Sequence, residues 1–171
     1  MAEITFKGRK IHTNSDLPKL GTKAPDFLLI DKELNERSLK DYKGKKKLLS
    51  VVISLDTPVC LTSAKKFNEE AASYPNLSIL YISADLPFAQ SRVCGAENLK
   101  QIETLSMMRN KNFGQDYGLL IQDGLLAGLL ARSIIILDEN DTVIYHELVP
   151  EITKEPNYEE ALEVIRNNSV I

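Results

Sequence analysis

The residues of this chain best suited to chemistry are Thr57 and Cys60, which stand in the stretch Asp-Thr-Pro-Val-Cys at 56–60. The stretch lies where an apolar strand pattern, residues 48–55, gives way to a helical pattern. A thiol at the start of a helix lies close to unpaired backbone N–H groups and a partial positive charge, and both favour the thiolate over the thiol. Thr57 adds a hydroxyl on the same side of the turn. The spacing therefore predicts an activated cysteine and favours redox chemistry.

Pro58 makes the turn before Cys60 stiff, because its ring fixes its own φ and biases the preceding residue toward an extended conformation. The chain contains only one further cysteine, Cys94. Taken alone, Cys94 is better explained as a structural thiol, since free cysteines are among the most buried residues. The chain has no Cys-x-x-Cys motif or nucleotide-binding glycine loop, and His12 and His146 are isolated. We therefore expect no metal site and no bound cofactor.

Length and composition are those of one globular domain spanning residues 1–171. Hydrophobic residues make up 43% of the chain and charged residues 26%, and the net charge of −3 argues against non-specific binding to nucleic acid. The longest largely apolar stretch, residues 125–136, is interrupted by Gly128, Arg132 and Ser133, so we expect no membrane span. Residues 1–10 lack the apolar core of a signal peptide. We therefore expect a cytoplasmic protein, in which any disulfide would be transient.

The rest of the sequence predicts the elements that must position these residues. They are a hairpin of residues 4–7 and 9–13, strands 27–30, 48–55 and 77–83, helices 62–72, 86–94 and 112–118, a second hairpin of strands 133–137 and 142–148, and a final helix 157–167. This order predicts an α/β fold with a mixed central sheet and helices on both faces. We interpret the three lysines at 45–47 as a solvated turn before the strand that follows.

Several longer stretches carry a family resemblance that covers nearly the whole chain. They are residues 21–27 (Gly-Thr-Lys-Ala-Pro-Asp-Phe), residues 54–63 around Thr-Pro-Val-Cys, residues 83–97 around Cys94, residues 130–133 and residues 151–156. In these stretches the chain resembles the bacterial thiol peroxidases, the atypical two-cysteine branch of the peroxiredoxins. The Thr-Pro-Val-Cys motif is typical of peroxiredoxins, and the segment around Cys94 narrows the resemblance to thiol peroxidases. The resemblance implies a thioredoxin-like fold with an added N-terminal β-hairpin.

The resemblance also implies roles for individual residues. Its catalytic set corresponds to Thr57, Pro58, Cys60, Cys94 and Arg132. Cys60 would attack hydrogen peroxide or an alkyl or lipid hydroperoxide and become a sulfenic acid, which Cys94 would resolve as an intramolecular disulfide. Thr57 and Arg132 would supply polar groups around the peroxide, and Pro58 would shield the thiolate. Thioredoxin is implied as the external reductant, and a homodimer as the assembly.

Two other functions stay open at this point. One is a peroxide sensor or redox relay that uses the same disulfide as a switch, and the other is a thioredoxin-like binding module with inert thiols. Repeated consumption of peroxide with thioredoxin would argue against the sensor, whereas slow alkylation of Cys60 would favour the binding module. Two departures from the family pattern, Val93 in place of a common aromatic residue and Leu125 in place of proline, bear on the shape of the pocket and on the mobility of the Cys94 segment.

A disulfide between Cys60 and Cys94 would require a change of conformation. Cys60 lies at the start of one predicted helical segment and Cys94 lies in another, and a disulfide needs Cα atoms within about 7 Å of each other. We therefore expect the first turn after Cys60 and the segment 86–94 to unwind partly on oxidation.

Overall fold

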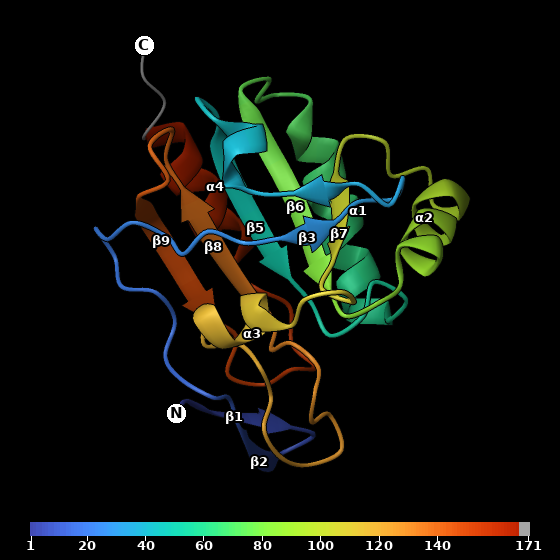
Figure 1. Ribbon diagram of the computed structural model, residues 1–171, viewed down its shortest axis with the longest axis vertical. Coiled ribbons are helices and arrows are strands. Elements are labelled where there is room, and N and C mark those ends of the chain that lie inside the picture. The colour runs from blue at the N-terminus through green and yellow to red at the C-terminus, as the bar shows by residue number, and fades with distance from the viewer. Residues whose placement is uncertain (168–171) are drawn as a thin grey trace.

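A mixed sheet forms the centre of the computed structural model, which describes residues 1–167 (Figure 1). Its strands are β3 (Leu29–Ile30), β4 (Glu36–Arg37), β5 (Lys46–Val51), β6 (Leu77–Ser83), β7 (Glu103–Ser106), β8 (Ser133–Leu137) and β9 (Val143–Leu148). The strand order is β4-β3-β7-β6-β5-β8-β9. β5, β6 and β7 run parallel to one another, and β8 pairs with β5 in the antiparallel sense. The carboxyl ends of the three parallel strands therefore meet at one edge of the sheet.

Helices cover both faces of the sheet, and a separate hairpin lies at one end of it, at the bottom of Figure 1. The helices are α1 (Pro58–Ala71), α2 (Pro87–Ala96), α3 (Asn112–Asp116) and α4 (Tyr158–Asn167), with a 3-10 helix η1 (Leu39–Tyr42), and the hairpin consists of β1 (Glu3–Phe6) and β2 (Arg9–His12). Within residues 1–167, none of the helices combines the length and the apolar character that crossing a membrane would need. The mixed sheet with flanking helices and the added N-terminal hairpin confirm the predicted fold.

The central strand β5 contributes to two apolar cores, one on each face of the sheet. Leu48 packs with residues of α1, α2 and α4, whereas Leu49 and Val51 pack with residues of α3, η1 and the hairpin. All three side chains have no exposed surface. Burial on both faces explains why this strand shows a continuous apolar run in place of an alternating pattern.

The most consequential difference from the predicted elements is the start of α1. The helix begins at Pro58, ahead of the predicted residue 62, so Cys60 lies within its first turn. Thr57 is the N-cap with extended backbone angles (φ −125°, ψ 150°), and proline is well suited to the first helical position because its missing N–H would have no partner there. β5 also ends at Val51, earlier than predicted, and the short elements β4, β7 and η1 were not predicted.

The interpretation of the lysine triplet as a solvated turn is wrong for Lys46 and Lys47. Both residues belong to β5 and are buried, and Lys47 has no exposed surface. The Lys47 ammonium group pairs with the carboxylate of Asp141, in the turn between β8 and β9. A buried ammonium group requires such a partner, because burying an unpaired charge is very costly.

Candidate active site

Cys60 is a free, fully buried thiol in the first turn of α1. The first backbone hydrogen bond of the helix runs from the N–H of Leu61 to the carbonyl oxygen of Thr57, at 2.9 Å. The thiol therefore lies beside the N-terminal end of the helix dipole, where negative charge is stabilised. Its environment is the core between α1, α4 and the sheet, from which water is excluded.

Arg132 lies directly before β8 and contacts the sulfur of Cys60. Its Nη1–H donates to Sγ at 2.9 Å, and its Nε–H donates to the carbonyl oxygen of Ile152 at 2.8 Å. Because β8 pairs with β5, position 132 lies at the same edge of the sheet as the end of β5, where the chain turns toward Cys60. Arg132 is only 3% exposed, so its permanent charge acts at short range with little screening. The guanidinium is thus placed to stabilise a negative charge on the sulfur.

Thr57 and Pro58 form the outer side of the site. The hydroxyl of Thr57 donates to the carbonyl oxygen of Ser54 at 2.9 Å. Since its proton is engaged there, Oγ1 retains lone pairs that can accept a hydrogen bond from a bound molecule. Thr57 is half-buried and Pro58 is exposed. The structure therefore brings Thr57, Pro58, Cys60 and Arg132 together in one place.

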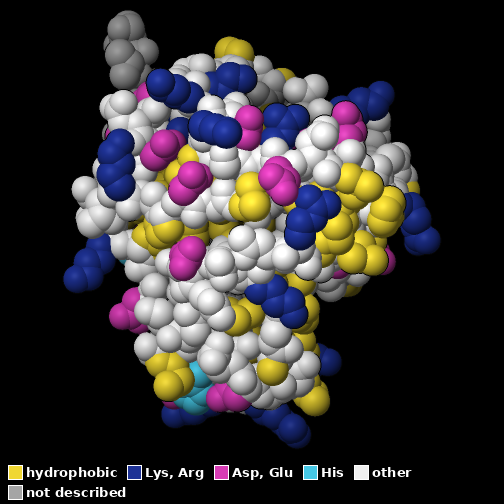
Figure 2. All heavy atoms as spheres, in the orientation of Figure 1, with side chains coloured by type: hydrophobic (Ala, Val, Ile, Leu, Met, Phe, Trp, Pro, Cys, Tyr) yellow, Lys and Arg dark blue, Asp and Glu magenta, His cyan; other side chains and the backbone are white. Residues whose placement is uncertain are grey.

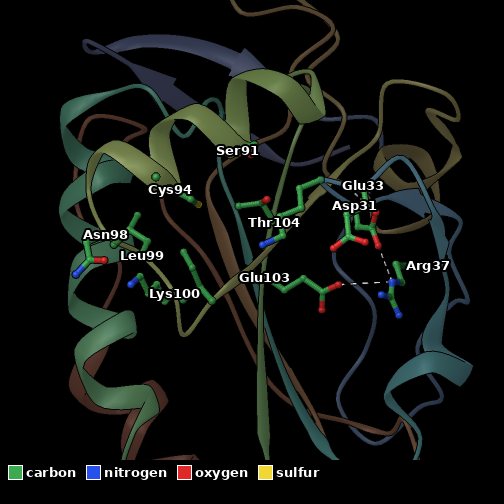
Figure 3. Close-up of a pocket in the computed structure, with 13 residues that line it drawn as sticks. Asp31, Glu33, Arg37, Ser91, Cys94, Asn98, Leu99, Lys100, Glu103 and Thr104 are labelled. Atoms are coloured by element: carbon green, nitrogen blue, oxygen red, sulfur yellow. Dashed lines mark hydrogen bonds and ion pairs between the residues drawn. The ribbon is translucent and has the colours of Figure 1, made fainter.

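Cys94 lies apart from this cluster, as a free, half-buried thiol in α2. It packs at the margin of the apolar core that encloses Cys60, and it also lines a cavity of about 520 Å³ (Figure 3). Burial raises the pKa of the Cys94 thiol, and the nearby charge of Lys32 opposes this only in part. The structure is the dithiol form, with α1 and α2 intact.

The wall of the cavity that faces Cys94 across Figure 3 is charged. Arg37 donates its Nε–H to Asp31 at 2.9 Å and lies 3.7 Å from a carboxylate oxygen of Glu103. Burial would raise the pKa of Asp31, but hydrogen bonds from Arg37 and from backbone N–H groups lower it overall. Burial raises the pKa of Glu103. No group of three or more His, Cys, Asp or Glu side chains in the described part of the chain is arranged to hold a metal ion.

Sequence reasoning missed the polar residues that support the site. Asp85 accepts hydrogen bonds from the hydroxyl of Ser54 at 2.7 Å and from the N–H of Leu55 at 2.8 Å. It also accepts one from the hydroxyl of Ser83 at 2.7 Å. Their position in the sequence could have indicated them. Ser54, Ser83 and Asp85 lie at or just after the ends of two buried strands, at the sheet edge where Cys60 also lies. Ile152, which holds Arg132 through its backbone, left no signal in its side chain.

Comparisons with known proteins give a consistent result. A family model described as Redoxin matches residues 19–162. The chain is 50% identical to a thiol peroxidase of Staphylococcus haemolyticus (strain JCSC1435), covering 98% of this chain and 99% of that protein. It is 46% identical to a thiol peroxidase of Bacillus subtilis (strain 168), covering 97% and 98%. A solved structure of a peroxiredoxin-like protein from Aquifex aeolicus superposes with a TM-score of 0.92 at 37% identity, covering 98% and 97%. The range that the Redoxin model matches, residues 19–162, includes the whole site described above.

Proposed function

Because the chain belongs to the redoxin family and, within it, to the thiol peroxidases, we propose that Cys60 is the thiolate that attacks the peroxide. The protein is an enzyme that reduces peroxides with electrons taken from thiols. The observation that supports Cys60 as the attacking group is the 2.9 Å contact from Arg132 Nη1 to its sulfur, in the first turn of α1. Burial raises the pKa of the Cys94 thiol, which makes Cys94 less suited to be the attacking thiolate at neutral pH.

In the first step, the sulfur of Cys60 attacks one peroxide oxygen in line with the O–O bond. The S–O bond forms as the O–O bond breaks, so the sulfur becomes a sulfenic acid and the other oxygen leaves as an alkoxide or hydroxide that takes up a proton. Arg132 stabilises the negative charge that moves from sulfur to the leaving oxygen. Thr57 Oγ1 accepts the hydrogen bond of the peroxide O–H, because its own proton is donated to Ser54.

Peroxide reaches the sulfur from the side of Pro58 and Val59. Cys60 has no exposed surface, whereas Pro58 is exposed and Val59 is half-buried. These two apolar side chains directly precede the thiol in the first turn of α1 and are accessible to solvent. Such an entrance supports organic hydroperoxides, with alkyl or lipid chains, as substrates alongside hydrogen peroxide. Pro58 also limits the access of water to the thiolate.

In the second step, the thiol of Cys94 condenses with the sulfenic acid, which releases water and leaves a Cys60–Cys94 disulfide. A dithiol protein, thioredoxin, then reduces this disulfide by exchange and restores both thiols. Thiol sulfur supplies both electrons of each cycle, so the proposed reaction requires no bound cofactor. We place this cycle in the cytoplasm, since a disulfide that must be reduced again in each turnover needs a reducing compartment.

We also propose that the protein forms a homodimer. Leu86 and Phe88, at the start of α2, are 53% and 65% exposed, and Leu125 is 86% exposed. Figure 2 shows hydrophobic side chains gathered on the side of the molecule where α2 lies. Exposed apolar surface of this kind is typical of protein–protein contacts. Sedimentation equilibrium of the reduced protein tests the proposal, which a monomer at all concentrations contradicts.

The mechanism is tested by intact-mass and peptide mapping of the reduced protein after one equivalent of cumene hydroperoxide. The expected product has lost two hydrogens and contains a linked Cys60–Cys94 peptide. A stable sulfenic or sulfinic acid on Cys60 without a link would remove Cys94 from the mechanism. An unmodified Cys60 would contradict its role. Repeated turnover with thioredoxin separates the enzyme from a sensor that reacts only once per molecule.

A further inference from the structure

Polar side chains converge at the carboxyl ends of the parallel strands, behind the loop that leads to Cys60. Ser54 follows β5, Ser83 is the last residue of β6, Asp85 comes two residues later, and Ser106 is the last residue of β7. Since parallel strands end at the same edge, these residues meet although they are far apart in the chain. Ser54 and Ser83 bind the carboxylate of Asp85, and Ser106 binds its backbone carbonyl oxygen.

The carboxylate of Asp85 binds the segment between β5 and α1 with both of its oxygens. One oxygen accepts from the hydroxyl of Ser54 at 2.7 Å, and the other accepts from the N–H of Leu55 at 2.8 Å. The second oxygen also accepts from the hydroxyl of Ser83 at 2.7 Å. Hydrogen bonds to a charged acceptor are stronger than bonds between neutral groups. Asp85 therefore fixes both the side chain of Ser54 and the backbone that follows it.

Ser54 connects this carboxylate to Thr57. Its carbonyl oxygen accepts the hydroxyl proton of Thr57 at 2.9 Å, and its own hydroxyl oxygen accepts from the N–H of Asp56 at 3.2 Å. The direction in which Thr57 Oγ1 presents its lone pairs thus depends on the place of the Ser54 backbone. That place depends in turn on Asp85.

Asp85 is itself held on rigid parts of the fold. Its carbonyl oxygen accepts from the hydroxyl of Ser106 at 2.5 Å, and its N–H donates to Ser83 Oγ at 3.3 Å. Gln90 of α2 donates to the same Ser83 oxygen at 3.0 Å and to the carbonyl oxygen of Leu105 at 2.9 Å. Groups locked in this way by a second layer of hydrogen bonds are suited to hold a reacting group in place.

We propose that Asp85 is a positioning residue for the reaction with peroxide, which acts by holding residues 54–57 so that Thr57 Oγ1 meets the peroxide at Cys60. The inference rests on the roles proposed above for Cys60 and Thr57. Arg132 is held elsewhere, by the carbonyl oxygen of Ile152. Loss of Asp85 therefore misplaces the Thr57 side of the site and leaves the contact between Arg132 and the thiolate in place.

The first experiment compares two reactions of Cys60 in a Cys94→Ser background, which leaves one thiol. In Asp85→Ala, we expect the single-turnover rate of oxidation by cumene hydroperoxide to fall at least tenfold, because small displacements of reacting groups are costly. Alkylation by iodoacetamide, which needs the thiolate but no peroxide oxygen, changes less than twofold. Asp85→Asn keeps one acceptor oxygen, so we expect a smaller fall in its oxidation rate than in Asp85→Ala. A parallel fall of both reactions in Asp85→Ala and Asp85→Asn overturns the proposal.

Asp138→Ala serves as a matched control. Asp138 accepts the N–H groups of Asn140 and Thr142, both at 2.9 Å, in the turn after β8. Because β8 runs antiparallel to β5, this turn lies at the opposite edge of the sheet from the thiol. Like Asp85→Ala, this substitution removes a carboxylate that accepts backbone N–H groups in a loop. We expect the oxidation rate of Cys60 to stay unchanged. Thermal midpoints of all variants are compared. An equal fall of the oxidation rate in Asp138→Ala overturns the positioning role.

A double-mutant cycle with Thr57→Val tests whether Asp85 acts through Thr57. We expect Thr57→Val to slow oxidation and Asp85→Ala to add less than a further twofold in that background. If the two losses multiply, or if only Thr57→Val slows the reaction, the inference about Asp85 is wrong while the proposed function stands. If Thr57→Val changes nothing, the assigned role of Thr57 fails, and the inference fails with it. Ser54→Ala, which removes one link alone, should behave like a weaker Asp85→Ala.

Discussion

Arg132 and Ile152 are joined by a hydrogen bond of 2.8 Å from the guanidinium Nε–H to the backbone carbonyl oxygen. The backbone of Ile152 is itself bound to the N-terminal hairpin, because its N–H donates to the carbonyl oxygen of Thr5 at 2.9 Å. Thr5 donates in turn to the carbonyl oxygen of Pro150 at 2.8 Å. The hairpin, which is separate from the central sheet, thus supports the guanidinium that contacts Cys60.

Glu151 makes this support sensitive to acid. Its carboxylate accepts from the N–H and hydroxyl of Thr153, the N–H of Gly8 and the hydroxyl of Thr5. Hydrogen bonds from the Thr153 and Gly8 backbone, above all, lower its pKa to about 2 from an ordinary value of 4.5. Because the pKa of Glu151 is lower in the folded than in the unfolded state, its ionised carboxylate stabilises the fold at pH values above the unfolded pKa of 4.5. This contribution is lost as the pH falls from 4.5 toward 2.

We therefore expect the amides of Thr5 and Ile152 to lose protection from hydrogen exchange between pH 4.5 and 2, relative to the β6 amides. In Glu151→Gln this dependence should be weaker, since the side chain no longer titrates. The pKa of Asp123 is also lowered, mainly by the side chain of His12 and then by its N–H. Asp123 therefore adds its own pH dependence in this range, which Asp123→Asn removes. An unchanged pH profile in the double variant would contradict the assignment.

Arg132→Ala should lower the rate of Cys60 oxidation by about a hundredfold or more, as expected when a donor to developing negative charge is removed. Arg132→Lys keeps the charge but cannot bind both Ile152 and the sulfur, and we expect an intermediate loss. Alkylation of Cys60 at neutral pH should slow in both variants, unlike in Asp85→Ala. Arg109→Lys, an exposed residue that pairs with Glu36, is the control. Normal alkylation in Arg132→Ala would show that the guanidinium does not stabilise the thiolate.

Cys94 should be the slower thiol of the reduced protein. Burial raises its pKa, so the thiolate fraction at neutral pH is smaller than for an ordinary cysteine. We expect iodoacetamide to label Cys60 before Cys94 at pH 7, and labelling of Cys94 to accelerate as the pH rises. Peptide mapping over a time course measures both rates. Faster labelling of Cys94 at pH 7 would contradict the assignment of the two roles.

Formation of the disulfide should loosen two segments that are ordered in the dithiol form. Cys60 is inside the first turn of α1, and Cys94 is inside α2. We expect the amides of residues 61–64 and 91–94 to exchange faster in the oxidised protein than in the reduced one. β6, between the two helices in the sequence, serves as the internal reference. Identical exchange in both redox states would show that the disulfide forms without unwinding.

Lys47 and Asp141 should behave as a pair in unfolding experiments. Asp141→Ala leaves a buried ammonium group without its partner, and we expect a loss of about 3 kcal/mol in the free energy of unfolding. Lys47→Met replaces the charge with an apolar side chain of similar length and should cost about 1 kcal/mol or less. Urea unfolding followed by circular dichroism measures both. A smaller loss in Asp141→Ala than in Lys47→Met would show that the pair contributes little.

The sequence was informative where local pattern decides structure. β6 has the predicted bounds because its apolar run is flanked by turn residues, and the turn 138–141 joins two strands as expected. The same reasoning misread Lys47, because its partner Asp141 lies far along the chain and three adjacent lysines resemble a solvated surface. β7, with only four residues, is too short to show a period.

The site was predictable only in part, for the same reason. A thiol at a helix start can be recognised from neighbouring residues, as at Thr57 and Cys60. The approach of Arg132 to the sulfur depends on the register of β8 against β5, which pairs Val51 with Ser133. Asp85 reaches Ser54 only because β5 and β6 are parallel neighbours. Such contacts depend on which strands pair and in which register, and a single sequence does not show this directly.

The separate supports of Arg132 and Thr57 have a consequence for how damage affects this molecule. One support comes from the segment of Ile152 and the hairpin, and the other comes from the strand end at Asp85. Injury to the second alone leaves a thiol that still reacts quickly with electrophiles but has lost its advantage for peroxides. Selectivity and reactivity can therefore be lost separately: loss of the Asp85 support lowers the preference for peroxides, whereas loss of the Ile152 support lowers the reactivity of the thiol itself.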